Sequence, residues 1–313
     1  MPMKLTIRFC TAFACFLLLG FKATPLPKLA APLPESEKAS AVVVYLEQTE
    51  IAVDGVDVEG GNAGVLGVLV AGIVENSVAS HRQRAIAPLR DAMLDFQFEE
   101  KLISALHAHL PTSMVQADAS IKIVRNDTEW RAYLRKNIPS TIFRVAVRYA
   151  FEQNLDIAYL LEQPNLLRFE RMPLSPEESK SKSKQERAKA LPTVLYAGSF
   201  YSEHVTHDPL HRDPQAKGQT PYKFNAASWA EQSAEPLKQA LLKSANEVAE
   251  LVQRDADTGL PPASSGKKVR AYMAHAIAPA WVNKAMQVEQ SGDRSLLLIG
   301  QNTHWIDNRQ IKP

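Results

Sequence analysis

The chain has 313 residues, of which 45% are hydrophobic, with 36 lysines and arginines against 34 acidic residues. A chain of this length and composition can bury one large core or two smaller ones, which excludes an intrinsically disordered protein. The balanced charge also excludes the strongly basic surface that binds nucleic acid or acidic lipid.

The first 31 residues have the layout of a secretory signal peptide. Lys4 and Arg8 precede an uncharged apolar run at residues 9–21, and no acidic residue comes before Glu35. The run has 13 residues, fewer than the roughly 20 that a membrane-spanning helix needs. We therefore expect export to the periplasm, with anchoring to the membrane through this N-terminal segment as the alternative.

Candidate cleavage points lie near Ala23 and near Ala30 or Ala31, and none has a clean small-residue pattern. Both cysteines, Cys10 and Cys15, precede these points. A mature chain would therefore have neither a disulfide nor a thiol nucleophile. Lipid attachment at Cys15 is disfavoured because much of the apolar run follows it. A mature chain that begins after Ala31 keeps 32 basic residues against 34 acidic ones and is nearly neutral.

Residues 32–40 continue a proline-rich stretch without a hydrophobic period, which predicts an extended tether. The main domain is predicted for residues 41–259. It begins with AVVVYLEQTEIAV, residues 41–53, whose β-branched residues indicate a strand. The Asp-Gly pair at residues 54–55 predicts a hairpin to a second strand.

The next segment, GGNAGVLGVLVAGIVEN at residues 60–76, holds five of the chain's thirteen glycines. No lysine follows these glycines and their spacing is by threes, so neither a P-loop nor a dinucleotide fingerprint is present. As a helix, the segment would present a flat ridge. Each glycine inside a helix lowers the stability of the helix by about 1 kcal/mol, so we expect another backbone to approach closely and offset this loss. We expect the segment to pack as a helix on the domain's own sheet. One alternative is a helix that contacts a partner, a second copy or the membrane, and another is a plain loop. The ridge consists of Gly60, Gly64, Gly67, Ala71 and Gly72.

Helical periodicity follows at residues 77–96, interrupted by Pro88, and at residues 98–110. Residues 119–125 alternate as a strand. Asn126 and Glu129 have capping-box spacing at the start of a short helix.

Two alternating segments, residues 141–151 and 155–162, form the best strand pair of the chain. Matching their apolar faces places Phe151 opposite Leu155 across a three-residue turn and Arg144 opposite Glu162 on a polar face.

Residues 173–192 are charged and of low complexity, which predicts a mobile excursion. A strand is expected at residues 193–204. A long helix is expected from Ser228, which has capping-box spacing with Glu231, to Gly259. Residues 266–313 are expected to form a small C-terminal β meander, whose clearest hairpin turns at Ser291, Gly292 and Asp293.

One histidine cluster, SEHVTHDPLHRDP at residues 202–214, could bind a metal. Zinc accepts imidazole and carboxylate ligands, so His204, His207 and His211 are candidate zinc ligands. The spacing matches no HExxH-type motif, and two prolines indicate a loop with nothing to fix the rings. We expect a polar loop without a cofactor, with zinc binding as the alternative.

The layout of residues 42–95, a strand followed by the glycine-rich segment and RQRAIAPLRDAML, resembles a group of uncharacterised exported proteins and lipoproteins of Gram-negative bacteria. The strand SFYS and the tryptophan-led helix at residues 228–252 are similar to the same group. The resemblance implies an exported protein and carries over no activity.

Taken together, these patterns predict an α+β protein with a mixed or antiparallel sheet and helices packed on one face. The function predicted is that of a non-enzymatic periplasmic protein of the cell envelope that binds a protein partner or itself. A metal-dependent hydrolase that uses the histidine cluster is the alternative.

Overall fold

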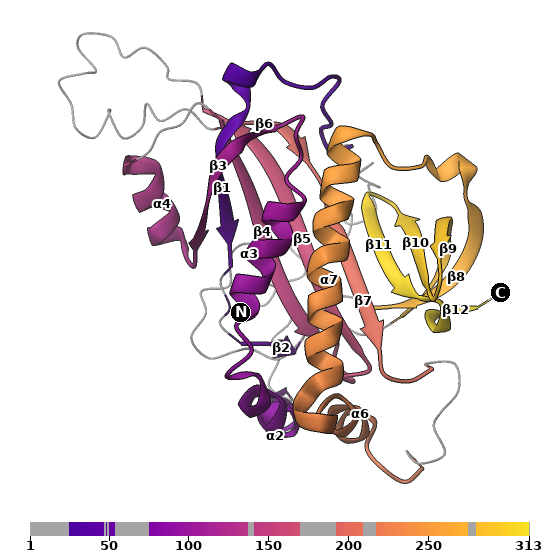
Figure 1. Ribbon diagram of the computed structural model, residues 1–313. Coiled ribbons are helices and arrows are strands. Elements are labelled where there is room, and N and C mark those ends of the chain that lie inside the picture. The colour runs from indigo at the N-terminus through magenta and orange to yellow at the C-terminus, as the bar shows by residue number, and fades with distance from the viewer. Residues whose placement is uncertain are drawn as a thin grey trace, which may run out of the picture.

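The computed structural model describes residues 25–46, 48, 50–53, 75–136, 141–169, 192–208, 217–274 and 280–312. Within these ranges the chain forms one twelve-stranded mixed sheet and five α-helices (Figure 1). The predicted α+β class is therefore confirmed. The glycine-rich segment, with Gly60, Gly64, Gly67, Ala71 and Gly72, and nearly all of the charged excursion lie outside the described residues.

The α-helices are α2 (Glu75–Met93), α3 (Phe98–Ala108), α4 (Asp127–Lys136), α6 (Pro221–Trp229) and α7 (Glu231–Asp257). The strands are β1 (Ala39–Tyr45), β2 (Ala52–Val53), β3 (Val115–Val124), β4 (Thr141–Phe151), β5 (Ile157–Arg168), β6 (Thr193–Ala197), β7 (Phe200–Val205), β8 (Lys267–Met273), β9 (Ala280–Ser291), β10 (Arg294–Ile299), β11 (Asn302–Asp307) and β12 (Ile311–Lys312). Short 3-10 turns occur at Glu35–Glu37, Ala263–Ser265 and Asn308–Gln310.

The strands run in the order β12-β8-β9-β10-β11-β7-β5-β4-β1-β3, with β2 beside β4 and β6 beside β5. The pairs of β1 with β3 and β4 and of β7 with β11 are parallel, whereas the β8 to β11 meander is antiparallel. Because β11 pairs with β7, the predicted C-terminal unit continues the sheet of the main domain. None of the described helices is long and apolar enough to cross a bilayer.

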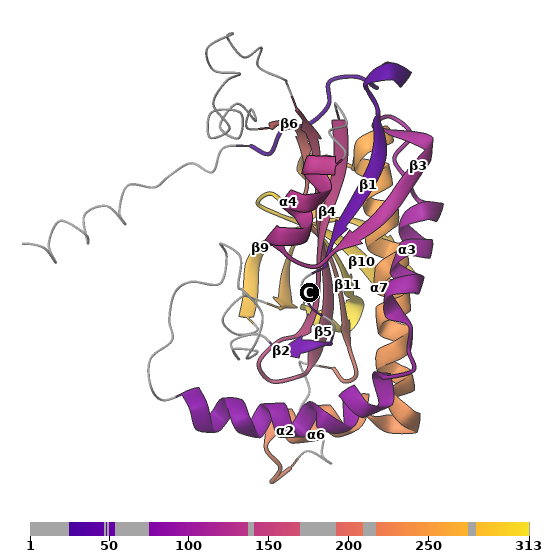
Figure 2. The same ribbon diagram turned by 90° about the vertical axis from the view of Figure 1, so that its left-hand side faces the viewer.

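Helices cover both faces of the sheet. The long helix α7 and the shorter α3 lie side by side across one face (Figure 1), as expected, and α4 lies on the other (Figure 2). Val42 and Val44 of β1 pack into the main core, and Val43 and Tyr45 pack with Tyr133 of α4. Burial of both faces explains why β1 reads as a continuous apolar run and does not alternate.

The predicted register of β4 and β5 is wrong. Arg144 lies opposite Asn165, and Glu162 lies opposite Val147 on the core face. The prediction treated Leu155 as a strand residue facing Phe151, whereas Leu155 belongs to the turn, with φ 61° and a fully buried side chain. The longer turn shifts the pairing by three residues, so Glu162 is turned to the opposite face from Arg144.

A tertiary hydrogen bond holds this turn. The indole Nε1 of Trp229, at the end of α6, donates to the carbonyl oxygen of Leu155 at 2.8 Å. The carboxylate of Glu152 accepts hydrogen bonds from the backbone N–H groups of Asn154 and Asp156, both at 2.7 Å. The turn is therefore held by local hydrogen bonds to Glu152 and by a tertiary one from Trp229, and the local sequence pattern does not contain the tertiary one.

The predicted start of the long helix at Ser228 is also wrong. Helix α6 ends at Trp229, and Gln232, Ser233 and Ala234 have left-handed φ values of 50°, 60° and 63° before α7 continues regularly. Ser228 does not cap α7, because its hydroxyl lies 3.2 Å from the carbonyl oxygen of Phe224. The break bends the chain into a corner between α6 and α7.

Other local predictions are confirmed. Asn126 caps α4, where its Oδ1 accepts the Glu129 N–H at 2.9 Å. Gly259, with φ 78°, follows the end of α7. The β9–β10 hairpin turns at Gly292, with φ 56°, as expected. The predicted tether is not wholly extended, because a 3-10 turn at Glu35–Glu37 and the start of β1 lie within it.

Candidate functional site

A pocket of about 440 Å³ lies where the end of β7 meets the corner between α6 and α7. We call it the corner pocket. Its walls come from three parts of the chain: the end of β7 and the residues that follow it, the last turn of α6, and the first turns of α7. The polar residues that line it include His204, Thr206, His207, Ser228, Gln239 and Lys243.

The break at the start of α7 positions two of these walls. Because the chain turns after Trp229, Ser228 of α6 and Gln239 of α7 lie on adjoining walls of the pocket. His207 contacts α6, with its Nε2 at 2.8 Å from the Ser228 Oγ and its ring 4.8 Å from that of Phe224.

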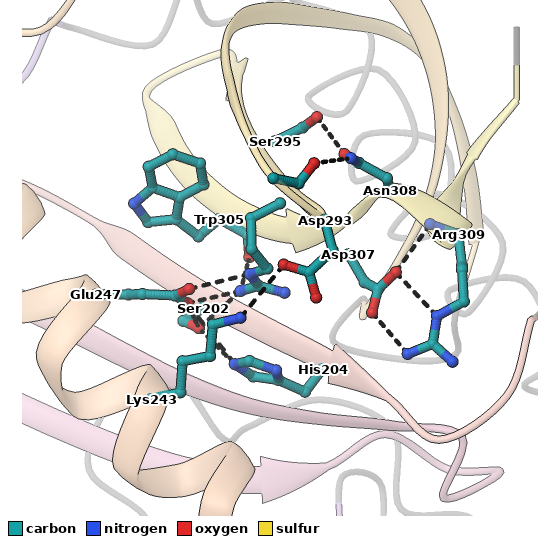
Figure 3. A network of polar contacts seen from close by, with 12 residues as sticks. Ser202, His204, Lys243, Glu247, Asp293, Ser295, Trp305, Asp307, Asn308 and Arg309 are labelled. Carbon is teal, nitrogen blue, oxygen red and sulfur yellow. Dashed lines mark hydrogen bonds and ion pairs between the residues drawn. The ribbon is translucent and has the colours of Figure 1, made fainter.

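His204 lies on the inner wall and belongs to a polar network behind it. Figure 3 shows His204 and Ser202 of β7 directed toward Glu247 of α7. The Nε2 of His204 lies 3.3 Å from the Ser202 Oγ and 3.6 Å from the Glu247 Oε2. The Ser202 hydroxyl donates to that same carboxylate oxygen at 2.6 Å.

Arg294 of β10 completes this network from the C-terminal strands. Its side chain is almost fully buried and donates from Nε and Nη2 to the two oxygens of Glu247, at 3.0 and 2.7 Å. It also donates to the carbonyl oxygens of Glu203 and Trp305, at 2.6 and 3.2 Å. The guanidinium therefore joins β10 to α7, β7 and β11.

The network fixes the charges of its members. Burial raises the pKa of Glu247, but the hydrogen bond to His204 and the charge and hydrogen bonds of Arg294 outweigh it, and the pKa is lowered to about 2. Burial lowers the pKa of His204 below its usual value, against the effect of Glu247. At neutral pH the network thus holds a carboxylate, a guanidinium and a neutral imidazole.

These residues do not form a nucleophilic triad. In a triad the histidine lies between serine and acid and contacts each through a different ring nitrogen. Here Ser202 and Glu247 both lie at the Nε2 of His204, and the serine donates directly to the acid. Ser202 is fully buried, so its hydroxyl has no access to a substrate.

A second buried group lies beside the first. The carboxylate of Glu203 lies 3.1 Å from the Nδ1 of His304 and accepts the Ala274 N–H at 2.9 Å. The ring of His304 stacks on Tyr201 at 4.4 Å. These contacts join β7, β11 and the end of β8, and none of them lines the pocket.

Of the three predicted metal ligands, the structure describes two, and both line the corner pocket. His204 and His207 contact different hydroxyl groups, those of Ser202 and Ser228. His211 lies outside the described residues, so the three-histidine arrangement stays a prediction. In the part of the chain that the structure describes, no three side chains of metal-binding type gather.

Sequence reasoning missed Glu247 and Arg294. Glu247 has a recognisable signal, because it lies close to the apolar stripe of the helix, between the buried residues Ala245 and Val248. A charged residue near the buried face of a helix usually has a partner. The partner itself has no local signal, since Arg294 lies 47 residues away on another element.

Comparison with known protein families, curated proteins and solved structures finds no match to this chain.

Proposed function

We propose that the chain is an exported, non-enzymatic protein of the cell envelope that binds a segment of a protein partner in the corner pocket. The observation that carries the proposal is the polar lining of the pocket, where His204, His207 and Ser228 lie beside Gln239 and Lys243. These side chains come from three parts of the chain and offer hydrogen-bond donors and acceptors to a polar segment of a partner.

The character of the pocket favours a polar segment. Small-molecule sites of similar volume are usually apolar and enclose most of the ligand. Here exposed side chains of Glu231, Gln239 and Lys243 line the pocket, together with two histidines. They offer both hydrogen-bond donors and acceptors, which suits a partner's polar side chains.

The closed hydrogen-bond network behind the pocket supports a binding role. Ser202 and Glu247 face Arg294 in the interior. Glu247 accepts hydrogen bonds from the Ser202 hydroxyl and from Arg294. We infer that this network supports the pocket wall and does no chemistry.

Capture of the partner tests the proposal. Lys243→Glu reverses a charge on the pocket wall, and Lys101→Glu makes the same change at an exposed site on α3. After mild cross-linking in the producing cell envelope, we expect proteins that co-purify with the wild type to be lost with Lys243→Glu and kept with Lys101→Glu. Identical co-purifying proteins for both variants would contradict the proposal.

Zinc binding is the second candidate, because His204 and His207 line the same pocket. It predicts one zinc ion per purified chain and loss of that ion in His207→Ala. Partner binding without a metal predicts no stoichiometric zinc in either protein. Metal analysis of the two proteins separates these functions.

A further inference from the structure

The residues that precede β1 lie along the folded protein. Leu26, Leu29 and Leu33 are half-buried, whereas residues between them are exposed. Leu29 and Leu33 pack against the main core. We call residues 25–33 the N-terminal strap.

Main-chain hydrogen bonds fix the strap at two points. The carbonyl oxygen of Pro27 accepts the N–H of Ala197, at the end of β6, at 2.9 Å. The N–H of Leu33 donates to the carbonyl oxygen of Ser113, also at 2.9 Å. The strap therefore contacts two segments that are distant from it in sequence.

Between these points, Lys28 reaches the C-terminal end of α7. Its ammonium group pairs with Asp255 and lies 5.0 Å from the centre of the Tyr196 ring. The Tyr196 hydroxyl donates to the same carboxylate at 2.6 Å. The Asp255 side chain is only 10% exposed, so Lys28 supplies the opposite charge for a largely buried carboxylate.

Burial, followed by the charge of Asp255, raises the pKa of Tyr196. The hydroxyl therefore remains a donor to the Asp255 carboxylate. Removal of Lys28 would leave that charge with a neutral partner.

We propose that the strap stays on the mature protein and that the export signal is cut after Ala23, not after Ala30 or Ala31. The inference rests on the proposed export. Water adds across the Ala23–Thr24 peptide bond, which leaves a carboxylate on Ala23 and an α-amino group on Thr24. A cut after Ala31 would remove Lys28 and Leu29 together with their contacts.

The mature N-terminus tests the position of the cut. Intact mass and N-terminal sequencing of protein from the envelope fraction are expected to show a chain that begins at Thr24. A chain that begins at Ala31 or Pro32 would overturn the proposal, and so would a chain that keeps its first residues. Partner capture is measured separately, so either result leaves the proposed binding function to its own test.

Substitutions in the strap test the retention of its contacts. The double variant Lys28→Ala with Leu29→Ala, purified from the envelope, is expected to unfold several degrees below the wild type. The control Lys101→Ala with Leu94→Ala removes the same side chains at exposed positions and is expected to leave the midpoint unchanged. If the strap variant unfolds at the wild-type temperature, the strap is either absent or without effect, and the proposal fails.

Discussion

Glu162 is a fully buried carboxylic acid in the described core. Its carboxylate lies between Val147 of β4 and Phe200 of β7, and neither oxygen has a hydrogen-bond partner among the described residues. Burial raises its pKa to about 8. The folded protein therefore holds Glu162 protonated at neutral pH, whereas the unfolded chain releases the proton near pH 4.5.

This difference makes stability depend on pH. Above pH 4.5 the unfolded state binds fewer protons than the folded state, so the free energy of unfolding falls until the pH passes about 8. Glu162→Gln keeps the size of the side chain and removes the charge. We expect Glu162→Gln to change the free energy of unfolding more favourably at pH 7 than at pH 4. The difference between the two changes should be on the order of 3 kcal/mol.

Urea unfolding at several pH values measures this effect. Glu100→Gln, at an exposed position on α3, serves as the control and should show no comparable trend. Equal pH profiles for the wild type and Glu162→Gln would show that Glu162 is ionised or solvated in the folded state.

Arg294 is essential to the network behind the pocket because it neutralises Glu247. Arg294→Met would leave a buried carboxylate without its guanidinium, at a cost of about 3 to 5 kcal/mol in the free energy of unfolding. The double variant with Glu247→Gln should recover part of this loss, since no charge then remains. Urea unfolding of the wild type, the two single variants and the double variant tests the coupling; a loss in the double variant equal to the sum of the two single losses would show that the two side chains act independently.

At the scale of elements, the corner between α6 and α7 is strained. Ser233 has a φ of 60° and an exposed side chain, and left-handed backbone is unfavourable for residues with a Cβ atom. Ser233→Gly is expected to stabilise the protein by up to about 1 kcal/mol, because glycine adopts this conformation without steric cost.

Asn246→Gly is the control, since Asn246 lies on the exposed face of the regular part of α7. There the same residue should destabilise the protein by a few tenths to about 1 kcal/mol. Thermal unfolding of both variants compares them, and a loss of stability in Ser233→Gly would contradict the left-handed corner.

The glycine ridge lies outside the described residues, so its role stays a prediction of the sequence. If Gly67 faces a second copy of the chain, Gly67→Leu will separate the backbones and lower the mass measured by sedimentation. If the ridge packs on the chain's own sheet, the mass will stay the same and the unfolding temperature will fall. Unchanged mass and stability would contradict both forms of the prediction.

Elements with local signals were predictable, and elements shaped by tertiary contacts were not. The Asn126 cap and the Gly292 turn depend on neighbouring residues only, and both are confirmed. The turn at Leu155 depends on Trp229, which lies 74 residues away. The apolar side chain of Leu155 is buried although the residue lies in a turn, so in the sequence it has the pattern of a strand residue. This pattern explains the wrong register.

In the candidate site, too, features with local signals were predictable and features shaped by tertiary contacts were not. Two histidines of the cluster in the sequence, His204 and His207, line one pocket, and their role stays a prediction. The pocket itself arises from the break in the helix after Trp229. The helical periodicity of the sequence continues across this break and therefore does not indicate it. The network behind it joins residues from four elements, and a single sequence carries no signal for their pairing.

At the scale of the whole molecule, the C-terminal strands are not an independent unit. They continue the sheet through the parallel pairing of Trp305 with Ser202, and Arg294 joins them to α7. We therefore expect a single unfolding transition in urea, with coincident curves from tryptophan fluorescence and far-ultraviolet circular dichroism. Separate transitions would indicate that the meander unfolds by itself.

We propose that the corner pocket receives a protein partner. A photo-reactive amino acid at Gln239, on the pocket wall, tests it most directly in the producing cell. Asn246, exposed on the same helix and absent from the pocket lining, is the matched control position. We predict a cross-linked partner from position 239 and none from position 246. The same adducts from both positions, or no adduct from position 239, would contradict the claim.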